Sequence, residues 1–309
     1  MRSLYAIINP ASESVGARLE RIDRAIVALG EGLGVTIHRT PIKELDCKTG
    51  DWSVIDAQLD RARNCDGVAV FGGDGTHAYV LGKLAALGER KEFIGIRCGT
   101  MNIGSGTSTL DSCFNFTKTE TRELDAIEAR VDGGTPSYAF IDAVIATTCV
   151  ARIDGKLGQI SAQKILKGVK EYDTPSPVGS SRTVVKVIRG GKEISLPTED
   201  NLMTVSAAFL TDGLKARVLA GGADPAACSG FGWGFILSDF PLVWADATKE
   251  TLAARPIRDV FMPLFDTDRV TVSGLLPEAH LVNDGNAVSR GESVEFCLKK
   301  KAVTVTVLI

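Results

Sequence analysis

Short apolar runs alternate with longer amphipathic stretches over the first 135 residues, and this alternation constrains the fold more than any other feature of the chain. The pattern is typical of β-strands that alternate with α-helices and build a parallel sheet. Residues 68–71 are apolar throughout and end in glycines, as expected of a buried parallel strand whose carboxyl end opens into a ligand crevice. We therefore predict an α/β domain with a Rossmann-like parallel sheet over residues 1–135. Its expected strands cover residues 4–8, 35–38, 67–71 and 93–96, and its expected helices cover residues 15–29, 52–64 and 76–87.

After the Gly-Gly-Thr-Pro sequence at residues 133–136, short β-like runs separated by turn residues replace the helical stretches. We predict a β-rich sandwich domain over residues 136–309, and we leave open whether its last strands return to the first domain. Residues 122–130 fit either a last helix or an edge segment, and the lysines at 299–301 fit a solvated hairpin turn. The expected strands are 139–147, 149–153, 183–188, 202–209, 216–219, 231–237, 242–245, 269–272, 279–282, 293–298 and 303–308.

Composition narrows the classes of protein to consider. The chain has 309 residues, of which 44% are hydrophobic and 24% are charged, as is typical of a folded chain with two domains. A formal net charge of -3 creates no field that would attract nucleic acid, so we expect no such partner. No apolar run suits a transmembrane helix or an export signal, and the seven cysteines include no Cys-x-x-Cys pair. We therefore expect a cytoplasmic protein with buried thiols, and we expect it to be a homo-oligomer.

A glycine-rich loop lies between the third predicted strand and the helix that follows it, at Gly72, Gly73, Gly75 and Thr76. In such a place backbone N–H groups and the positive end of the helix dipole face the edge of the sheet, where phosphate binds. Glycines let the main chain approach phosphate oxygens without a Cβ atom in the way, and the threonine can cap the helix or donate its hydroxyl. The loop therefore predicts a phosphate-binding site.

Asp74 is the unusual member of this loop, because an acid among phosphate-binding glycines repels the ligand. Three uses would offset that repulsion: binding magnesium through water, accepting the proton of an attacking hydroxyl, or holding the loop by hydrogen bonds. A tight glycine turn with a helix-capping aspartate is the interpretation that needs no ligand. The sequence contains no Walker P-loop, and this loop is not the first strand-to-helix turn, where dehydrogenases carry their glycines.

Four motifs in order along the chain resemble the superfamily of NAD kinases and diacylglycerol or sphingosine-type lipid kinases. Phe-Gly-Gly-Asp-Gly-Thr at residues 71–76 is similar to the signature that these kinases share. Ile-Asn-Pro-Ala-Ser at residues 8–12 and Gly-Thr-Met-Asn at residues 99–102 match two further motifs at the expected spacing. Val-Asn-Asp-Gly-Asn at residues 282–286 is similar to the turn that precedes their last strands.

The resemblance implies an α/β domain and a β-sandwich, with nucleotide bound in the cleft between them and with ATP and Mg²⁺ as ligands. It implies that the phosphates or the acceptor are surrounded by Asn9, Gly72, Gly73, Gly75, Thr76, Thr100, Met101 and Asn102. It also implies that Asp74 is the catalytic residue, near the reacting hydroxyl or a magnesium ion that it holds directly or through water. From the residues alone, Asn9 and Asn102 are either amide donors at strand ends or formers of turns and caps.

The motifs indicate two different classes of acceptor. Those at residues 8–12 and 99–102 look more like the lipid kinases, whereas the late turn at residues 284–286 looks more like NAD kinases. Asn286 stands where lipid kinases usually carry a glutamate, and an amide cannot act as a base. Ile141 and Asp142 stand where NAD kinases usually carry an Asn-Glu pair.

Residues 140–146 resemble a divergent ATP-NAD kinase-like group found with acetoin-utilisation proteins. Asp142, Asp284 and Asn286 are the candidate residues on the acceptor side, and Asp142 is either a buried site carboxylate or an acid at a strand edge. We favour an ATP-dependent kinase with a nucleotide acceptor, because nothing in the sequence predicts an exposed membrane-docking helix. A lipid acceptor and a non-catalytic nucleotide sensor are the alternatives.

Overall fold

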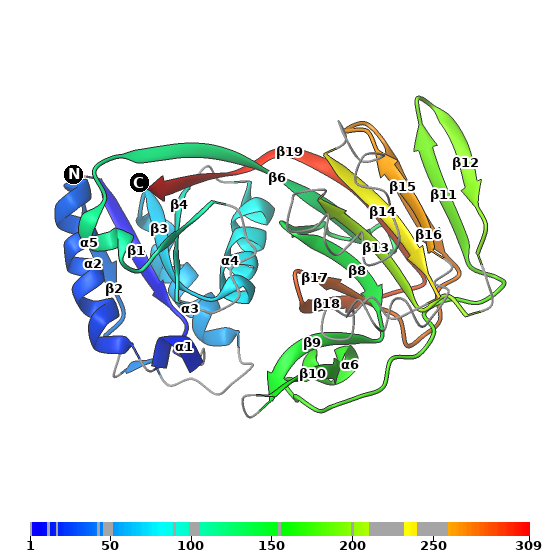
Figure 1. Cartoon of the computed structure of the whole chain (residues 1–309), viewed down its shortest axis with the longest axis horizontal. Coiled ribbons are helices and arrows are strands. Elements are labelled where there is room, and N and C mark those ends of the chain that lie inside the picture. The colour runs from blue at the N-terminus through cyan, green and yellow to red at the C-terminus, as the bar shows by residue number, and fades with distance from the viewer. Residues whose placement is uncertain are drawn as a thin grey trace, which may run out of the picture. The chain divides into compact units, whose positions relative to one another are not determined.

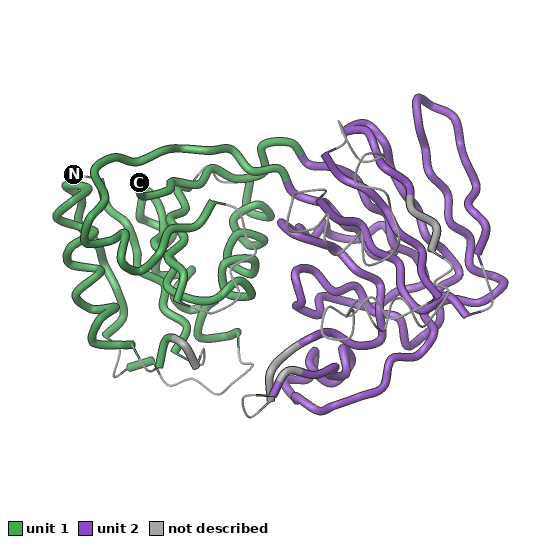
Figure 2. Tube along the Cα trace, viewed as in Figure 1, with its two compact units in different colours: residues 1–125, 300–309 green, residues 126–299 purple. Residues whose placement is uncertain are grey.

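The computed structural model divides into two compact units (Figure 1, Figure 2). It describes residues 2–10, 13–16, 18–41, 44–45, 52–88, 91–98, 106–153, 156–198, 201–209, 232–239 and 259–309. Unit 1 comprises residues 1–125 and 300–309, and unit 2 comprises residues 126–299. The boundary that the sequence analysis placed after residue 135 therefore falls within unit 2, and the end of the chain groups with unit 1.

The sheet of unit 1 is parallel. Strands β1 (Ser3–Ile8), β2 (Thr36–Arg39), β3 (Gly67–Gly72) and β4 (Glu92–Arg97) lie in the order β2-β1-β3-β4. Strand β4 also pairs in parallel with β5 (Thr107–Thr109) and with the end of β19 (Ser293–Leu308). All six residues of β3 are buried, which explains why its sequence is a continuous apolar run. The predicted parallel sheet is confirmed.

Helices lie on both faces of this sheet (Figure 1). One face packs on α2 (Leu19–Leu33): side chains that alternate along β1, such as Leu4 and Ala6, share a buried cluster with Ile22 and Ala25 of the helix. The chain also forms α1 (Glu13–Gly16), α3 (Ser53–Arg61) with a following 3₁₀ turn (Ala62–Asn64), α4 (Asp74–Leu87) and α5 (Ser112–Asn115). The single helix predicted over residues 15–29 is thus two helices. The second of them ends where Gly34 adopts a left-handed conformation with φ 63°.

Unit 2 is a β-sandwich of two largely antiparallel sheets. One has the order β12-β11-β16-β19, with β6 beside β19 and β7 beside β6, and the other has the order β15-β14-β13-β8-β17-β18. Inward side chains of both sheets form one core in which the Phe235 and Phe296 ring centroids lie 6.5 Å apart. The strands are β6 (Thr119–Val131), β7 (Ser137–Ala139), β8 (Asp142–Ala146), β11 (Val184–Arg189), β12 (Lys192–Leu196), β13 (Thr204–Phe209), β14 (Trp233–Ser238), β15 (Asp259–Leu264), β16 (Arg269–Ser273), β17 (His280–Asn283) and β18 (Asn286–Arg290).

A smaller hairpin belongs to the same unit. Strands β9 (Thr148–Ile153) and β10 (Lys156–Ser161) pair only with each other among the described strands, and the short helix α6 (Ala162–Ile165) follows them (Figure 1). Buried side chains of this hairpin and of α6 pack against Val282 of β17 and Ala287 of β18. The predicted strand 149–153 is therefore confirmed as β9. The strands predicted at 216–219 and 242–245 lie outside the described residues.

Two long strands correct the sequence analysis. Residues 122–130, left open between a helix and an edge segment, belong to the strand β6. The hairpin turn predicted at residues 299–301 is wrong, because residues 293–308 form the single strand β19. Lys300 Nζ lies 2.7 Å from Asp125 Oδ2 and Lys301 Nζ lies 2.7 Å from Glu123 Oε2, so acidic groups of β6 pair with these lysines. A run of like charges can therefore sit on a strand beside an acidic partner strand.

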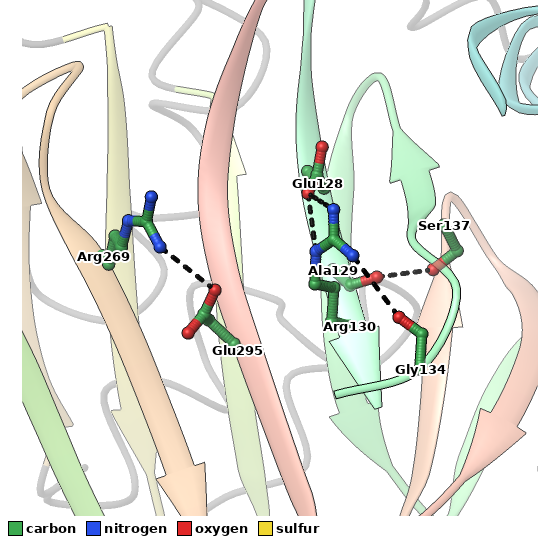
Figure 3. Close-up of polar contacts among 7 residues, drawn as sticks. All are labelled: Glu128, Ala129, Arg130, Gly134, Ser137, Arg269 and Glu295. Atoms are coloured by element: carbon green, nitrogen blue, oxygen red, sulfur yellow. Dashed lines mark hydrogen bonds and ion pairs between the residues drawn. The ribbon is translucent and has the colours of Figure 1, made fainter. Parts of the chain in front are cut away.

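The strands of the first sandwich sheet carry polar pairs (Figure 3). Arg130 Nε donates to Glu128 Oε1 over 2.8 Å, and the Arg269 guanidinium lies 3.6 Å from a Glu295 carboxylate oxygen. Such pairs on strands that also line a core are typical of an antiparallel sheet with one solvated face.

No helix among the described residues is long and apolar enough to cross a membrane.

Candidate functional site

The glycine-rich loop lies at a reversal in the strand order of unit 1. After β1 the chain adds β2 on one side, and it then returns to add β3 on the other side of β1. In open parallel sheets, ligands bind outside the carboxyl ends of the two strands that flank such a reversal. Asn9 follows β1 and Gly73 follows β3, so two sequence-predicted site residues flank this point.

Asn9 is bonded to the loop directly. Its backbone N–H donates to Phe71 O over 3.3 Å, and its side-chain Nδ2 donates to Thr76 Oγ1 over 2.8 Å. Thr76 is buried, and its side chain lies so close to Gly72 that a Cβ atom there would stand 2.7 Å from Thr76 Cβ. Gly72 is therefore required for packing, and Asn9, Gly72 and Thr76 form one cluster.

Gly73 and Gly75 are different, because a Cβ atom added at either position would meet no atom within 4 Å. Neither has a positive φ, so neither glycine is required by the backbone conformation. Both residues are partly exposed, and Gly73 is the N-cap of α4. Open space beside glycines at a helix N-terminus is what close approach of an anion to the main chain requires.

Asp74 is the first residue of α4 and is partly exposed. A carboxylate in the first turn of a helix interacts favourably with the helix dipole, so the charge is compatible with the fold. Three residues later His77 is buried, with Nε2 3.1 Å from Val70 O and its ring edge-on to Phe93. Burial lowers the pKa of His77, which favours the neutral ring at physiological pH. His77 thus packs in the core beneath the loop.

Gln58 of α3 is a positioning residue that the sequence analysis missed. Its side chain is buried and bonds both backbone groups of Ile8, with Oε1 accepting from Ile8 N and Nε2 donating to Ile8 O, each over 2.9 Å. The last pair between β1 and β2 is Ala6 with Arg39, so Gln58 replaces a strand neighbour beyond the end of β2. It thereby fixes the residue that precedes Asn9. A polar residue on the apolar side of the predicted helix was the only indication in the sequence.

The remaining predicted residues of this site, Thr100, Met101 and Asn102, lie outside the described residues.

The acceptor-side candidates come together in unit 2. Asp284 and Gly285 have φ values of 50° and 80° and form the two-residue turn between β17 and β18, with Asn283 paired to Asn286. Turns with two positive φ values favour the Asp-Gly sequence. Asp284 N donates to Asp142 O over 2.9 Å, which joins the turn to the start of β8.

The Asp284 carboxylate accepts three backbone hydrogen bonds. They come from Phe140 N over 2.8 Å, Ile141 N over 2.7 Å and Asp142 N over 3.0 Å. Burial, and secondarily the negative charge of Asp142, raise the pKa of Asp284 to about 7, while the three N–H donors act in the opposite direction. Asp142, Asp284 and Asn286 are thus neighbours, and Asp284 also has a structural task.

Comparisons with known proteins show the fold of the chain, and few of the similar proteins have a described function. No known family model matches the chain. A protein of Archaeoglobus fulgidus, described only as uncharacterized, is 29% identical over 160 residues, which are 51% of this chain and 50% of that protein. The match therefore spans about half the length of this curated relative.

Solved structures are similar over almost the whole chain. A crystal structure described as a "putative diacylglycerol kinase" from Bacillus anthracis has a TM-score of 0.54 and 17% identity, and it covers 98% of this chain and 95% of its own. Yeast NADH kinase complexed with NADH has a TM-score of 0.49 and 12% identity, and it covers 100% of this chain and 83% of its own. The acetoin-utilisation group stays a prediction. The chain has the fold of the Bacillus anthracis structure, which agrees with the α/β domain and the β-sandwich that the resemblance to NAD kinases and diacylglycerol kinases implied.

Proposed function

We propose that the protein is an ATP-dependent kinase that transfers a phosphoryl group to a hydroxyl of a small molecule. One observation carries the proposal: an open glycine turn enters a helix at the strand-order reversal of a parallel sheet, with Asn9 bonded across it to Thr76. This arrangement provides main-chain N–H groups, an amide and a helix dipole for phosphate. Because phosphoryl transfer depends mainly on positioning and charge stabilisation, such a loop supplies much of what the reaction needs.

Asp74 is the residue that we assign to the chemistry. A carboxylate at the first residue of α4 lies where phosphates would meet the loop, so it can accept the proton of an attacking hydroxyl. It also suits Mg²⁺, which nucleotide sites hold with one or two carboxylates and the phosphates themselves. No cluster of three or more ionisable metal ligands occurs in the described part of the chain. The cleft between the domains stays a prediction.

The acceptor is the finer part of the proposal. Asp284 and Asn286, at the turn between β17 and β18, and Asp142, at the start of β8, are the polar neighbours to which we assign the acceptor hydroxyl, and a nucleotide is the acceptor that the sequence favours. A non-catalytic nucleotide sensor would keep the glycines and have no need of Asp74. Replacing Asp74 should therefore abolish phosphoryl transfer by an enzyme, whereas it should leave the nucleotide binding of a sensor intact.

Substitution of Asp74→Asn tests the catalytic role. Binding of ATP with Mg²⁺, measured by calorimetry, should stay within a few-fold, whereas phosphoryl transfer should fall at least about 100-fold, since general-base catalysis contributes that much or more. Transfer is followed by mass spectrometry over NAD, diacylglycerol, sugar and polyol acceptors. Glu20→Gln is the matched control, because Glu20 is also an acid in the first turn of a helix of unit 1 and is exposed. Wild-type protein that binds ATP and phosphorylates no acceptor would leave the sensor as the explanation.

Substitution of Gly75→Ala tests the phosphate contact. The added Cβ meets open space and replaces a helical glycine, so stability should rise by as much as about 1 kcal/mol. Affinity for ATP should nevertheless fall, because the methyl group would occupy the space that we assign to phosphate. Unchanged ATP affinity in a stable Gly75→Ala protein would remove the loop from the nucleotide site.

A further inference from the structure

Residues 164–172 of unit 2 carry an unusual concentration of exposed apolar side chains. Leu166, Val169 and Tyr172 have exposed fractions of 43%, 49% and 49%. No other stretch of nine residues within the described ranges carries three of the large exposed hydrophobic side chains. Single exposed apolar residues are normal on proteins, but a cluster indicates a surface that meets something apolar.

This segment is held in a defined turn. After α6, Gly168 N donates to Ile165 O over 2.8 Å and Val169 N donates to Lys164 O over 3.0 Å, while Gly168 has a φ of 74°. These two bonds and the left-handed glycine form a Schellman motif. The residue at the Val169 position usually packs back on its own helix, yet here it stays half exposed. The fold thus presents this valine to its surroundings.

The end of the segment is bonded to the neighbouring hairpin. Ser161 N donates to Glu171 O over 3.0 Å, and Tyr172 pairs with Ile160 in an isolated bridge. A Cβ atom on Gly158 would lie 2.5 Å from the Tyr172 ring, so the ring lies against the main chain of β10. The half-exposed tyrosine is therefore fixed on a strand.

The charge of the segment is positive in an acidic protein. Residues 162–172 contain the three lysines Lys164, Lys167 and Lys170 and the one acid Glu171, although the chain as a whole has a net charge of -3. The acid is already neutralised, because Lys164 Nζ lies 2.5 Å from Glu171 Oε1. The apolar side chains are thus interspersed with uncompensated positive charge, which is complementary to an anionic surface.

The segment begins beside the strands that carry the acceptor-side turn, because Ile165 packs with residues of these strands. Cys149, Ile160 and Ala162 form a buried cluster with Val282, and Ile165 and Ala287 pack against it. Val282 and Ala287 flank the turn that contains Asp284 and Asn286. A surface that bound residues 164–172 would therefore be brought near this turn.

We propose that residues 164–172 dock the protein on an anionic lipid bilayer. A short turn is too small for a stable protein interface, which buries about 800 Å² on each partner. Exposed apolar side chains among lysines instead bind a bilayer by shallow insertion together with attraction to anionic lipids. Combined with the proposed kinase activity, on which this part rests, docking makes the acceptor a lipid with a free hydroxyl. The sequence analysis favoured a nucleotide because it found no docking helix, and the docking residues form a turn and a strand edge.

Vesicle flotation tests the docking. Wild-type protein should bind phosphatidylcholine vesicles that contain phosphatidylglycerol, bind less at high salt, and bind pure phosphatidylcholine weakly. The double substitution Leu166→Ser with Val169→Ser, and separately Lys167→Glu, should each reduce binding at least about tenfold. The matched control is Val184→Ser with Ile188→Ser, which changes two exposed apolar residues of β11 in the same unit and should leave binding unchanged. Equal loss in both double variants would overturn the assignment to this segment.

A tryptophan at the turn gives a second measurement that does not depend on losing an interaction. In Val169→Trp, the emission should shift to the blue when anionic vesicles are added, and brominated lipid should quench it. The emission of the native tryptophans is a background, and it is measured with the wild-type protein. No shift and no quenching, or no flotation of wild-type protein, would refute the docking.

Failure of the docking and failure of the kinase proposal give different results. Vesicle binding is measured without ATP, and phosphoryl transfer is measured on NAD and on diacylglycerol dispersed in detergent micelles. Transfer without vesicle binding overturns the docking alone. Vesicle binding without transfer to any acceptor overturns the kinase alone.

Discussion

At the scale of single residues, two Asp-Gly turns show how alike a motif residue and a purely structural residue can be. Asp284 and Asp132 have φ values of 50° and 49°, and each precedes a glycine with positive φ. The Asp132 carboxylate accepts backbone bonds from Glu292 N over 3.0 Å and from Ser293 N over 2.8 Å. The carboxylate of Asp142 lies beside Asp284 and contributes to raising its pKa, so electrostatics rather than turn geometry marks Asp284 as a site candidate.

The raised pKa of Asp284 predicts a pH dependence of stability. Its folded pKa of about 7 lies above the ordinary value, so the folded state holds a proton that the unfolded state has lost between about pH 4 and pH 7. This group therefore lowers the free energy of unfolding as pH rises through that window. In Asp284→Asn the contribution is absent, so the stability of the variant relative to wild type should increase by at least about 1 kcal/mol from pH 4 to pH 8. Urea denaturation across this range measures it.

A matched control separates the charge from the turn. Asp132→Asn keeps a side chain that tolerates the left-handed conformation, so it measures what the change from aspartate to asparagine costs such a turn. A constant loss in Asp284→Asn is expected as well, because one of the three backbone N–H donors then faces an amide NH₂. If the relative stability of Asp284→Asn instead falls as pH rises, the three donors outweigh burial and the carboxylate is ionised in the folded protein.

At the scale of elements, the sequence analysis found the strands and helices that a local residue pattern determines. The buried strands of unit 1 were found because each is a continuous apolar run that ends at turn residues. Strand β6 was left open because residues 119–123 are exposed and polar, with no alternation to mark a strand. Strand β19 was divided because Lys299, Lys300 and Lys301 resemble a turn until the acidic partners of Lys300 and Lys301 on β6 are known. Pairing with distant residues decides both strands, and a single sequence does not show it.

The candidate site likewise has features that the local sequence predicts and features that only the folded chain shows. The loop at residues 72–76 was predicted because its glycines are adjacent in sequence and follow a recognisable strand. That Gly72 is needed for packing, whereas Gly73 and Gly75 border open space, depends on where Thr76 lies. The bonds of Gln58 to Ile8 join residues 50 positions apart, so the local pattern marks Gln58 only as a polar residue on the apolar side of its helix and does not indicate its partner.

The contact between α3 and β1 predicts a cost for removing the Gln58 amide. In Gln58→Leu the side chain keeps its size, but the buried N–H and C=O of Ile8 lose their partners. An unsatisfied buried polar group costs about 1–3 kcal/mol, so the free energy of unfolding should fall by about 3 kcal/mol. Because Asn9 follows Ile8, ATP affinity should fall too. Gln163→Leu, at an exposed position of α6, is the control, and a loss in Gln58→Leu no larger than in this control would show that water replaces the amide.

At the scale of the whole molecule, the two units differ in how the chain forms them. Unit 2 is one continuous stretch, whereas unit 1 is completed only by residues 300–309 from the end of the chain. Val305 is fully buried there, Val303 and Leu308 are nearly so, and Ile309 exchanges backbone hydrogen bonds with Thr117 and Lys118. The predicted phosphate loop therefore belongs to a unit that cannot be complete until the last strand has been added.

Dividing the chain at the unit boundaries tests this organisation. Residues 1–125 alone should not fold, because without Val303, Val305 and Leu308 they lose about 1.5–3 kcal/mol for each buried side chain, which approaches the 5–15 kcal/mol stability of a typical domain. Lys301 N donates to Asp125 Oδ1 over 2.8 Å, so the two parts of unit 1 end side by side. Joining residue 125 to residue 300 through a loop of about four residues should therefore restore a cooperative unfolding transition. Residues 126–299 expressed alone should also unfold cooperatively, since their core lies between their own two sheets. Circular dichroism melting of the three fragments decides the matter: cooperative unfolding of residues 1–125 without the last strand would mean that β19 is an accessory to unit 1 and not part of its core.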